Sequence, residues 1–204
     1  MLRWNRRIIW GAAEAASFYW GDYMNYVEPI RDNTLVHRIS DYLKESNDRN
    51  YILFLLGIYT GLRISDILNL RVRDVHRKKC ISIRERKTGK QQLLEINPVL
   101  RRELDRYCQD KNIKEYLIKS REGINRPLGR VQAYNILRSV ADVFNISNMG
   151  CHTMRKTFGY HFYKQTNDIV TLQHIYNHDH PSITLKYIGI KQEAINDAIK
   201  NFKI

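Results

Sequence analysis

The sequence has few of the features that mark exported, metal-binding or membrane-spanning proteins. Its 204 residues include only three cysteines, Cys80, Cys108 and Cys151. This odd number, without the spacing of metal ligands, indicates neither a disulfide framework nor a zinc site. No stretch reaches the ~20 apolar residues of a membrane-spanning helix, and internal repeats and low-complexity linkers are lacking. These absences favour one folded domain in a reducing cytoplasm, with no membrane partner.

Acidic residues are also scarce. Only 21 Asp and Glu stand against 34 Lys and Arg, which gives a formal net charge of +13. A positive surplus of this size favours a polyanionic partner. Because the basic residues are spread along the chain and interleaved with 13 tyrosines, we expect a folded basic face rather than a disordered basic arm.

Residues 1–26 differ from the rest of the chain. Trp4, Trp10 and Trp20 lie there among several arginines and a run of small residues. The segment partly resembles a signal peptide, but Glu14 interrupts its apolar run. We therefore expect residues 1–26 to form a short helical extension, and residues 27–204 to form the main domain.

The apolar spacing predicts a mainly helical domain with one small antiparallel β-sheet. Helices are expected over residues 35–43, 52–59, 65–70, 97–108, 130–144, 181–187 and 192–202, with two more beginning near residues 152 and 168. Residues 80–96 alternate apolar and polar side chains around a turn that contains Lys87, which predicts a hairpin. Gly61 is expected to end one helix and Ser65 to cap the next, so that Arg63 lies at the junction between them.

Two arginines, two histidines and a late tyrosine together suggest phosphoryl transfer. Arginine forks bind phosphate oxygens bidentately, histidine can move a proton near neutral pH, and a deprotonated phenol is a nucleophile. His152 and Arg155 are three residues apart at an expected helix start, so their side chains share one face of the first turn. Each residue alone is weak evidence, since it has an ordinary structural explanation.

In their order along the chain, these residues resemble the catalytic domain of the tyrosine recombinases, also called the phage integrase family. The family pattern has an arginine in a Thr-Gly-Leu-Arg segment, an acidic residue, a hairpin lysine, a His-x-x-Arg pair, a second histidine and a tyrosine nine positions later. The residues that match it are Arg63, Asp66, Lys87, His152, Arg155, His178 and Tyr187. The resemblance runs from about residue 27 to the C-terminus, and the ordered combination makes chance improbable.

The resemblance implies cleavage and rejoining of double-stranded DNA without metal or nucleotide cofactor. Tyr187 would attack the scissile phosphate and form a 3′-phosphotyrosyl link. Arg63, Arg155 and His178 would stabilise the negative charge that develops on the phosphate oxygens.

The proton transfers are assigned by the same resemblance. Lys87 would protonate the departing 5′ oxygen. Because an ordinary tyrosine with a pKa of about 10 is protonated at pH 7, Tyr187 needs a base or a strongly cationic pocket, and His152 is the candidate proton acceptor. Asp66 is expected to support Arg63 or a neighbouring histidine rather than to react, with stabilisation of a helix N-terminus as the alternative.

The chain also departs from the family pattern. Many relatives have Leu-Gly-His followed by small residues, whereas this chain places Asp179 and His180 after His178, which predicts weakened or pH-dependent cleavage. Relatives carry an N-terminal core-binding domain of which this chain shows no counterpart, so we expect weaker, salt-sensitive DNA binding.

The resemblance further implies self-association into a tetramer on DNA, with accessory DNA-bending factors as further partners. The tail, residues 192–202, would pack on a neighbouring subunit or fold back on its own core. Two rival functions stay open: a type IB topoisomerase, and a non-catalytic DNA-binding remnant of an integrase.

Overall fold

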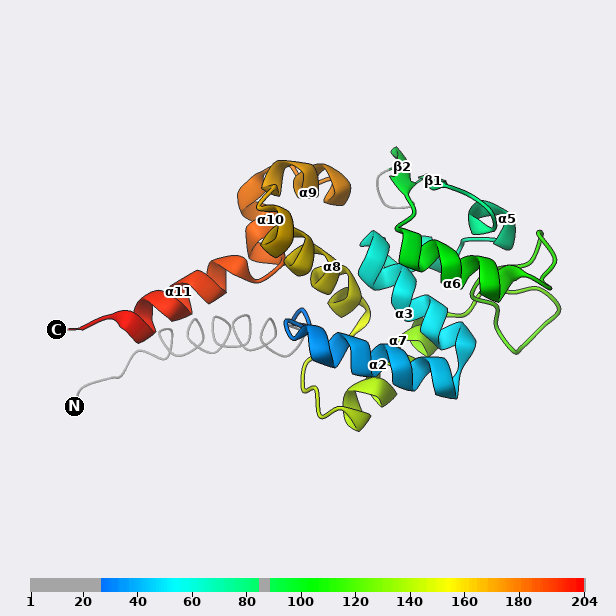
Figure 1. Cartoon of the computed structure of the whole chain (residues 1–204), viewed down its shortest axis with the longest axis horizontal. Coiled ribbons are helices and arrows are strands. Elements are labelled where there is room, and N and C mark those ends of the chain that lie inside the picture. The colour runs from blue at the N-terminus through cyan, green and yellow to red at the C-terminus, as the bar shows by residue number, and fades with distance from the viewer. Residues whose placement is uncertain (1–26, 85–88, 204) are drawn as a thin grey trace, which may run out of the picture.

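The structure, a computed structural model, describes residues 27–84 and 89–203 (Figure 1). The first half contains α2 (Asn33–Ser46), α3 (Asp48–Thr60), α4 (Ile64–Ile67), α5 (Val72–Val75), β1 (Cys80–Arg84), β2 (Gln91–Glu95) and α6 (Pro98–Cys108). The second half contains α7 (Arg130–Val143), α8 (Cys151–Thr166), α9 (Ile169–Tyr176), α10 (Pro181–Tyr187) and α11 (Ile190–Asn201). The prediction of a mainly helical domain with one small antiparallel sheet is confirmed.

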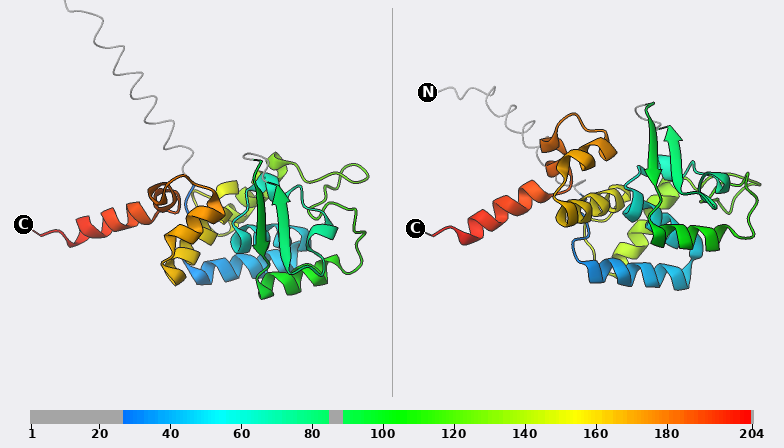
Figure 2. Two further views of the ribbon diagram at one scale, coloured as in Figure 1. Left: turned by 90° about the horizontal axis from the view of Figure 1, so that it is seen from above. Right: turned by 45° about the horizontal axis from the view of Figure 1, so that its top comes forward.

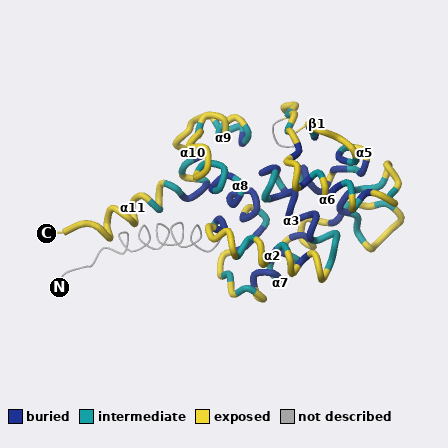
Figure 3. Tube along the Cα trace, viewed as in Figure 1, coloured by how far each residue is buried: buried dark blue, intermediate teal, exposed yellow. Residues whose placement is uncertain are grey.

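Helix α3 forms the centre of the main core. It is apolar on all sides, and buried side chains follow one another from Tyr51 to Leu56. Helices α2, α6 and α8 pack around it. Figure 3 shows the buried residues, in dark blue, gathered along α3 and its neighbours. A helix that is apolar all round is stable only where neighbours cover every face, as they do here.

A second, smaller core holds the C-terminal helices together. Leu172, Tyr176 and Ile188 form its buried centre, and Phe158 and Phe162 of α8 pack against them. Because Met154 of α8 belongs to the main core, α8 joins the two clusters. The residues near its N-terminal end therefore lie where both cores meet.

The expected hairpin is confirmed. Strands β1 and β2 pair antiparallel, with Ile81 opposite Leu94 and Ile83 opposite Gln92. Figure 2 shows the hairpin standing beside the helical body. Residues 85–88 of its turn lie outside the described residues, and the predicted catalytic residue Lys87 is one of these four.

The helix junction around Arg63 differs in detail from the prediction. Gly61 does end α3, with φ of 63°, and a Cβ atom there would collide with the Phe158 ring. Ser65, however, does not cap the next helix: α4 begins at Ile64 and its N-cap is Arg63. The Arg63 carbonyl accepts hydrogen bonds from the backbone of both Asp66 and Ile67, at 2.9 and 3.1 Å, so the first turn closes before Ser65 could act as its cap.

Helix α11 extends away from the body (Figures 1 and 2). Its apolar side chains Ile195, Ile199 and, just beyond it, Phe202 are 43%, 69% and 74% exposed. Of the two alternatives for the tail, folding back onto its own core is therefore not observed. An exposed apolar face of this kind is available to another molecule.

Within the residues that the structure describes, no helix is both long enough and apolar enough to cross a membrane.

Candidate active site

The predicted site residues that the structure describes come together where the two cores meet. Arg63 comes from the α3–α4 junction, His152 and Arg155 from the first turns of α8, His178 from the loop after α9, and Tyr187 from the end of α10. Local sequence explains this placement: α8 starts directly after Gly150, whose backbone N–H donates to the Thr153 hydroxyl at 3.0 Å. Pro181 is the first residue of α10 and fixes where that helix begins.

The Tyr187 hydroxyl lies 3.1 Å from Nδ1 of His152. The two rings meet edge to face, with centroids 6.4 Å apart. For His152 to accept the phenolic proton, its own ring proton must reside on Nε2, so the contact assigns that tautomer in the reactive state. The distance is that of a nucleophile and its general base.

Arg155 is the most enclosed charged group of the site, at 4% exposure. Its guanidinium donates to the carbonyl oxygens of Gly61 and Tyr176, the latter at 3.1 Å, and lies 4.1 Å from the centre of the Tyr176 ring. It also hydrogen-bonds the Tyr187 side chain. The planar fork is thus fixed in orientation by partners from three parts of the chain.

Arg63 also reaches the carbonyl oxygen of Tyr176. Its Nη2 donates to the Tyr176 carbonyl at 3.5 Å, so both arginines of the pattern converge on one acceptor. Asp66, one turn later, is 5% exposed. Its backbone N–H donates to the Arg63 carbonyl at 2.9 Å, and the supporting role predicted for this buried carboxylate stays a prediction.

His178 is held by both its side chain and its backbone. Its Nδ1 lies 2.9 Å from the hydroxyl of Thr184, which is fully buried. Its carbonyl accepts from the Gln173 side chain at 2.9 Å, and its N–H donates to the Gln173 carbonyl at 3.1 Å. If the Thr184 hydroxyl donates to Nδ1, the ring proton lies on Nε2, where it can be offered to a phosphate oxygen.

Ionisation in the site is shifted by burial and by neighbouring cations. The pKa of His152 is lowered, first by desolvation and then by the positive charges of Arg130 and Arg155. Desolvation also lowers the pKa of His178, followed by the charges of Arg155 and Arg63. Neutral histidine is therefore the resting form of both rings, which suits His152 as a proton acceptor.

Tyr187 is shifted in the opposite sense. Burial raises the pKa of its phenol, and the charge of Arg155 offsets part of that rise. Since the phenol holds its proton firmly at rest, ionisation requires transfer to a base in direct contact.

Several residues that contribute to the site were missed by sequence reasoning. Tyr176 supplies the carbonyl that both arginines share, and its buried hydroxyl donates back to the Arg155 carbonyl. From the hairpin, Lys90 donates to Asn177 at 2.6 Å and Gln92 to the Ile175 carbonyl at 3.0 Å. Backbone acceptors leave no sequence signal, although a lysine on each side of the hairpin turn could have drawn attention to Lys90.

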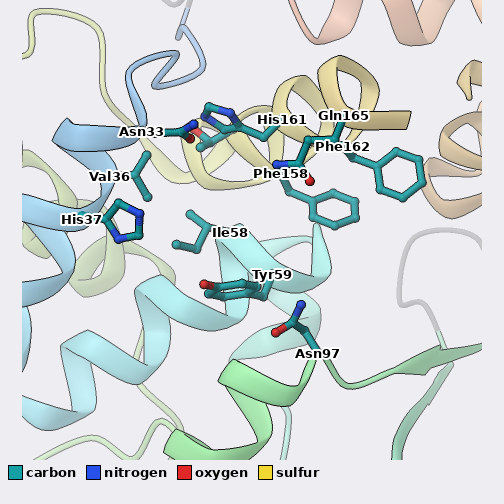
Figure 4. Close-up of a pocket in the computed structure, with 11 residues that line it drawn as sticks. Asn33, Val36, His37, Ile58, Tyr59, Asn97, Phe158, His161, Phe162 and Gln165 are labelled. Carbon is teal, nitrogen blue, oxygen red and sulfur yellow. The ribbon is translucent and has the colours of Figure 1, made fainter. Parts of the chain in front are cut away.

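A cavity of about 400 Å³ lies away from this constellation, between α2, α3 and α8 (Figure 4). Phe158, His161 and Phe162 of α8 form one wall, and Ile58 and Tyr59 of α3 another. None of the predicted site residues lines it. Among the described residues, no group of three or more His, Cys, Asp and Glu side chains could hold a metal ion.

Comparison with known proteins agrees with this geometry. The sequence model of the phage integrase family matches residues 32–193. The chain belongs to the phage integrase family. The family name suggested by the residue pattern is thus confirmed.

Individual phage integrase relatives give the same result. The probable integrase/recombinase YoeC of Bacillus subtilis (strain 168) is 45% identical over 179 residues, which cover 88% of this chain and 98% of that protein. The crystal structure of XerA recombinase superimposes with a TM-score of 0.69 at 18% identity, over 88% of this chain and 65% of XerA. A post-cleavage complex of XerH recombinase bound to a palindromic difH substrate gives 0.67 at 16% identity, over 87% and 54%.

At these identities the two structures establish the fold of the catalytic domain. The chain spans nearly the whole of the Bacillus relative, but only 51 to 65% of further tyrosine recombinases that it matches. Those relatives contain a large segment with no counterpart in the present match.

Proposed function

We propose that this chain is a site-specific tyrosine recombinase that cleaves and rejoins double-stranded DNA through Tyr187. The observation that carries the proposal is the 3.1 Å contact between the Tyr187 hydroxyl and His152, beside two arginines that converge on the Tyr176 carbonyl. These groups supply a nucleophile, a base and paired cations for phosphate oxygens, as phosphodiester cleavage without a metal requires.

In the proposed reaction, the Tyr187 oxygen bonds to the scissile phosphorus while the bond from phosphorus to the 5′ oxygen breaks. The phenolic proton passes to His152, and Lys87 gives a proton to the departing 5′ oxygen. Arg63, Arg155 and His178 stabilise the charge on the non-bridging oxygens. Attack by a 5′-hydroxyl on the 3′-phosphotyrosyl bond reverses these steps and restores the tyrosine.

DNA as the partner is supported by the charge of +13 and by DNA-bound structures of the same fold, such as the XerH complex. Self-association on DNA, as a tetramer, is supported by the exposed apolar face of α11. We also propose residues 1–26 as an extension preceding a catalytic domain at residues 27–204, and a cytoplasmic location. Accessory DNA-bending factors stay a prediction.

Covalent trapping tests the proposal. Purified protein is mixed with nicked duplexes taken from the DNA that flanks its own gene, and the products are separated on a denaturing gel. A protein–DNA adduct is expected from the wild type and not from Tyr187→Phe. If no flanking duplex yields an adduct, the chain is instead a DNA-binding remnant.

Plasmid relaxation distinguishes the remaining alternative. A type IB topoisomerase shares the active-site chemistry but relaxes supercoils on DNA of unrelated sequence. We expect adducts only on particular flanking sequences and no relaxation of an unrelated plasmid. Efficient relaxation of such a plasmid would assign the chain to the topoisomerase class.

A further inference from the structure

Lys156, the residue after Arg155, is a buried cation that the mechanism above does not use. It is 7% exposed, its Nζ donates to the Val27 carbonyl at 2.8 Å, and it lies 5.3 Å from the centre of the Tyr187 ring. Buried ammonium groups are costly unless specific partners compensate the lost hydration. Here the partners are a backbone oxygen and the ring of the nucleophile.

The Val27 carbonyl belongs to a segment that is itself fastened to α8. We call residues 27–32, which precede α2, the N-terminal strap. The Ile30 N–H donates to the Thr157 hydroxyl at 2.9 Å, and the Ile30 carbonyl lies 2.8 Å from Nε2 of His161. Three successive contacts therefore hold the strap along α8, and Lys156 makes the one nearest to Tyr187.

The charge of Lys156 also acts on the proton acceptor. Its positive charge is one of those that lower the pKa of His152. The charged groups that act on the His152 ring come from the α3–α4 junction, α7 and α8, and the phenol that contacts it comes from α10; they are Arg63, Arg130, Arg155, Lys156 and Tyr187. Burial lowers the pKa of Lys156 itself, the charge of Glu28 offsets part of that lowering, and the charge of Arg31 adds to it.

We propose that Lys156 is a positioning residue for the nucleophile, which holds the face of the Tyr187 ring through its ammonium group and is itself fixed by the N-terminal strap. The inference rests on the proposed function, since it assigns a residue to the same reaction. Lys156 forms no bond with substrate; it sets the ring orientation of Tyr187, and its charge adds to the burial and the arginine charges that lower the pKa of His152. A cation over an aromatic ring is attracted to the ring face, whereas an apolar side chain provides neither this attraction nor the charge.

The test compares Lys156→Met, which keeps an unbranched side chain one atom shorter and loses the charge, with Lys156→Arg, which keeps the charge and the donor. Single-turnover cleavage of a nicked duplex is measured against pH. We expect Lys156→Met to slow cleavage roughly 3- to 30-fold, the range that a cation–π contact of this kind supports. We also expect its acid limb to move to higher pH, because His152 becomes easier to protonate. The arginine variant should restore both.

Thr157→Val is the matched control. It removes a strap contact on the same helix but leaves the charge near Tyr187 and His152 unchanged. We expect its pH profile to match the wild type, even where its thermal stability is reduced. If Lys156→Met and Lys156→Arg slow cleavage equally without moving the pH profile, Lys156 acts only through its shape and the inference is wrong.

A second measurement does not depend on cleavage. The titration of His152 is followed by NMR in DNA-free protein, with its signal assigned from His152→Gln. Lys156→Met should raise the pKa of His152, and Lys156→Arg should leave it near the wild-type value. Failure of the wild type to form any adduct overturns the proposed function, whereas wild-type cleavage together with an unchanged His152 titration in Lys156→Met overturns the role of Lys156.

Discussion

Replacement of Arg155 by lysine should damage both stability and cleavage. Arg155 donates to the carbonyls of Gly61 and Tyr176 from one planar fork and covers the Tyr176 ring at 4.1 Å. Lysine keeps the charge but carries it as a single point on a flexible stem. A lysine ammonium at this position can reach only one of the two carbonyls, so the other carbonyl stays buried and loses its hydrogen bond from residue 155.

The size of the effect follows from these contacts. A hydrogen bond that involves a charged group contributes about 1.5–3 kcal/mol. In a protein of this size each kcal/mol corresponds to about 2–4 °C in the melting temperature, so Arg155→Lys should lower it by about 3–12 °C. Cleavage should fall by about 10²–10³, the loss measured when one oxyanion-stabilising donor is removed.

Thermal unfolding followed by circular dichroism and single-turnover cleavage of a nicked duplex measure the two effects. Arg63→Lys is the comparison, because Arg63 is half-buried and its bond to the Tyr176 carbonyl is long, at 3.5 Å. It should lose similar activity with a smaller change in melting temperature. If Arg155→Lys melts at the same temperature as the wild type, the reasoning that the guanidinium fork stabilises the protein through these two carbonyls is refuted.

Three further predictions concern pH, assembly and the loop after α9. The pKa of His152 is lowered, and its neutral form accepts the proton. The cleavage rate should therefore stay constant from about pH 8 to about pH 6.5, the ordinary pKa of histidine, and fall only at lower pH. A rate profile whose acid limb begins above pH 7 would contradict this. Replacing Ile199 and Phe202 by serine should change stability by less than about 0.5 kcal/mol, as expected for exposed positions, yet reduce the size of DNA-bound assemblies in sedimentation; unchanged assemblies would exclude α11 as the contact. Burial and the charges of Arg155 and Arg63 lower the pKa of His178, and Asp179 offsets part of that lowering. Asp179→Ser should therefore lower that pKa further and, by removing a negative charge near the proposed phosphate position, speed cleavage. An identical rate and pH profile would show that Asp179 has no influence.

Much of the fold could be predicted because local patterns determine it. Apolar spacing located the helices, and Asn97 with Pro98 marked the start of α6, where the Asn97 side chain does accept from the backbone of Val99. Ser65 misled because a favoured capping residue is only one way to start a helix. Here the Arg63 carbonyl begins the first turn two residues earlier.

The sequence predicted which side chains belong to the site, but it did not predict the contacts between them. Order along the chain can match Arg63, Arg155 and Tyr187 to a family pattern, but it does not say that two arginines meet at one backbone oxygen. Arg63 and the Tyr176 carbonyl are 113 positions apart, and Arg155 and the Gly61 carbonyl 94. Contacts of that separation depend on how the two cores pack, which periodicity does not specify.

The C-terminal end of α9 explains how these cations can be kept close together before any phosphate arrives. The last carbonyls of a helix lack intrahelical donors and carry partial negative charge. In α9 the Ile175 carbonyl accepts from Gln92 of the hairpin, and the Tyr176 carbonyl accepts from both Arg63 and Arg155. The helix end therefore offsets the repulsion between the two guanidinium groups and orients them, while the same bonds attach α9 to the hairpin and to the main core. Because these acceptors are weak compared with a phosphate dianion or diester, the arrangement holds both arginines in position without competing strongly with the substrate for them.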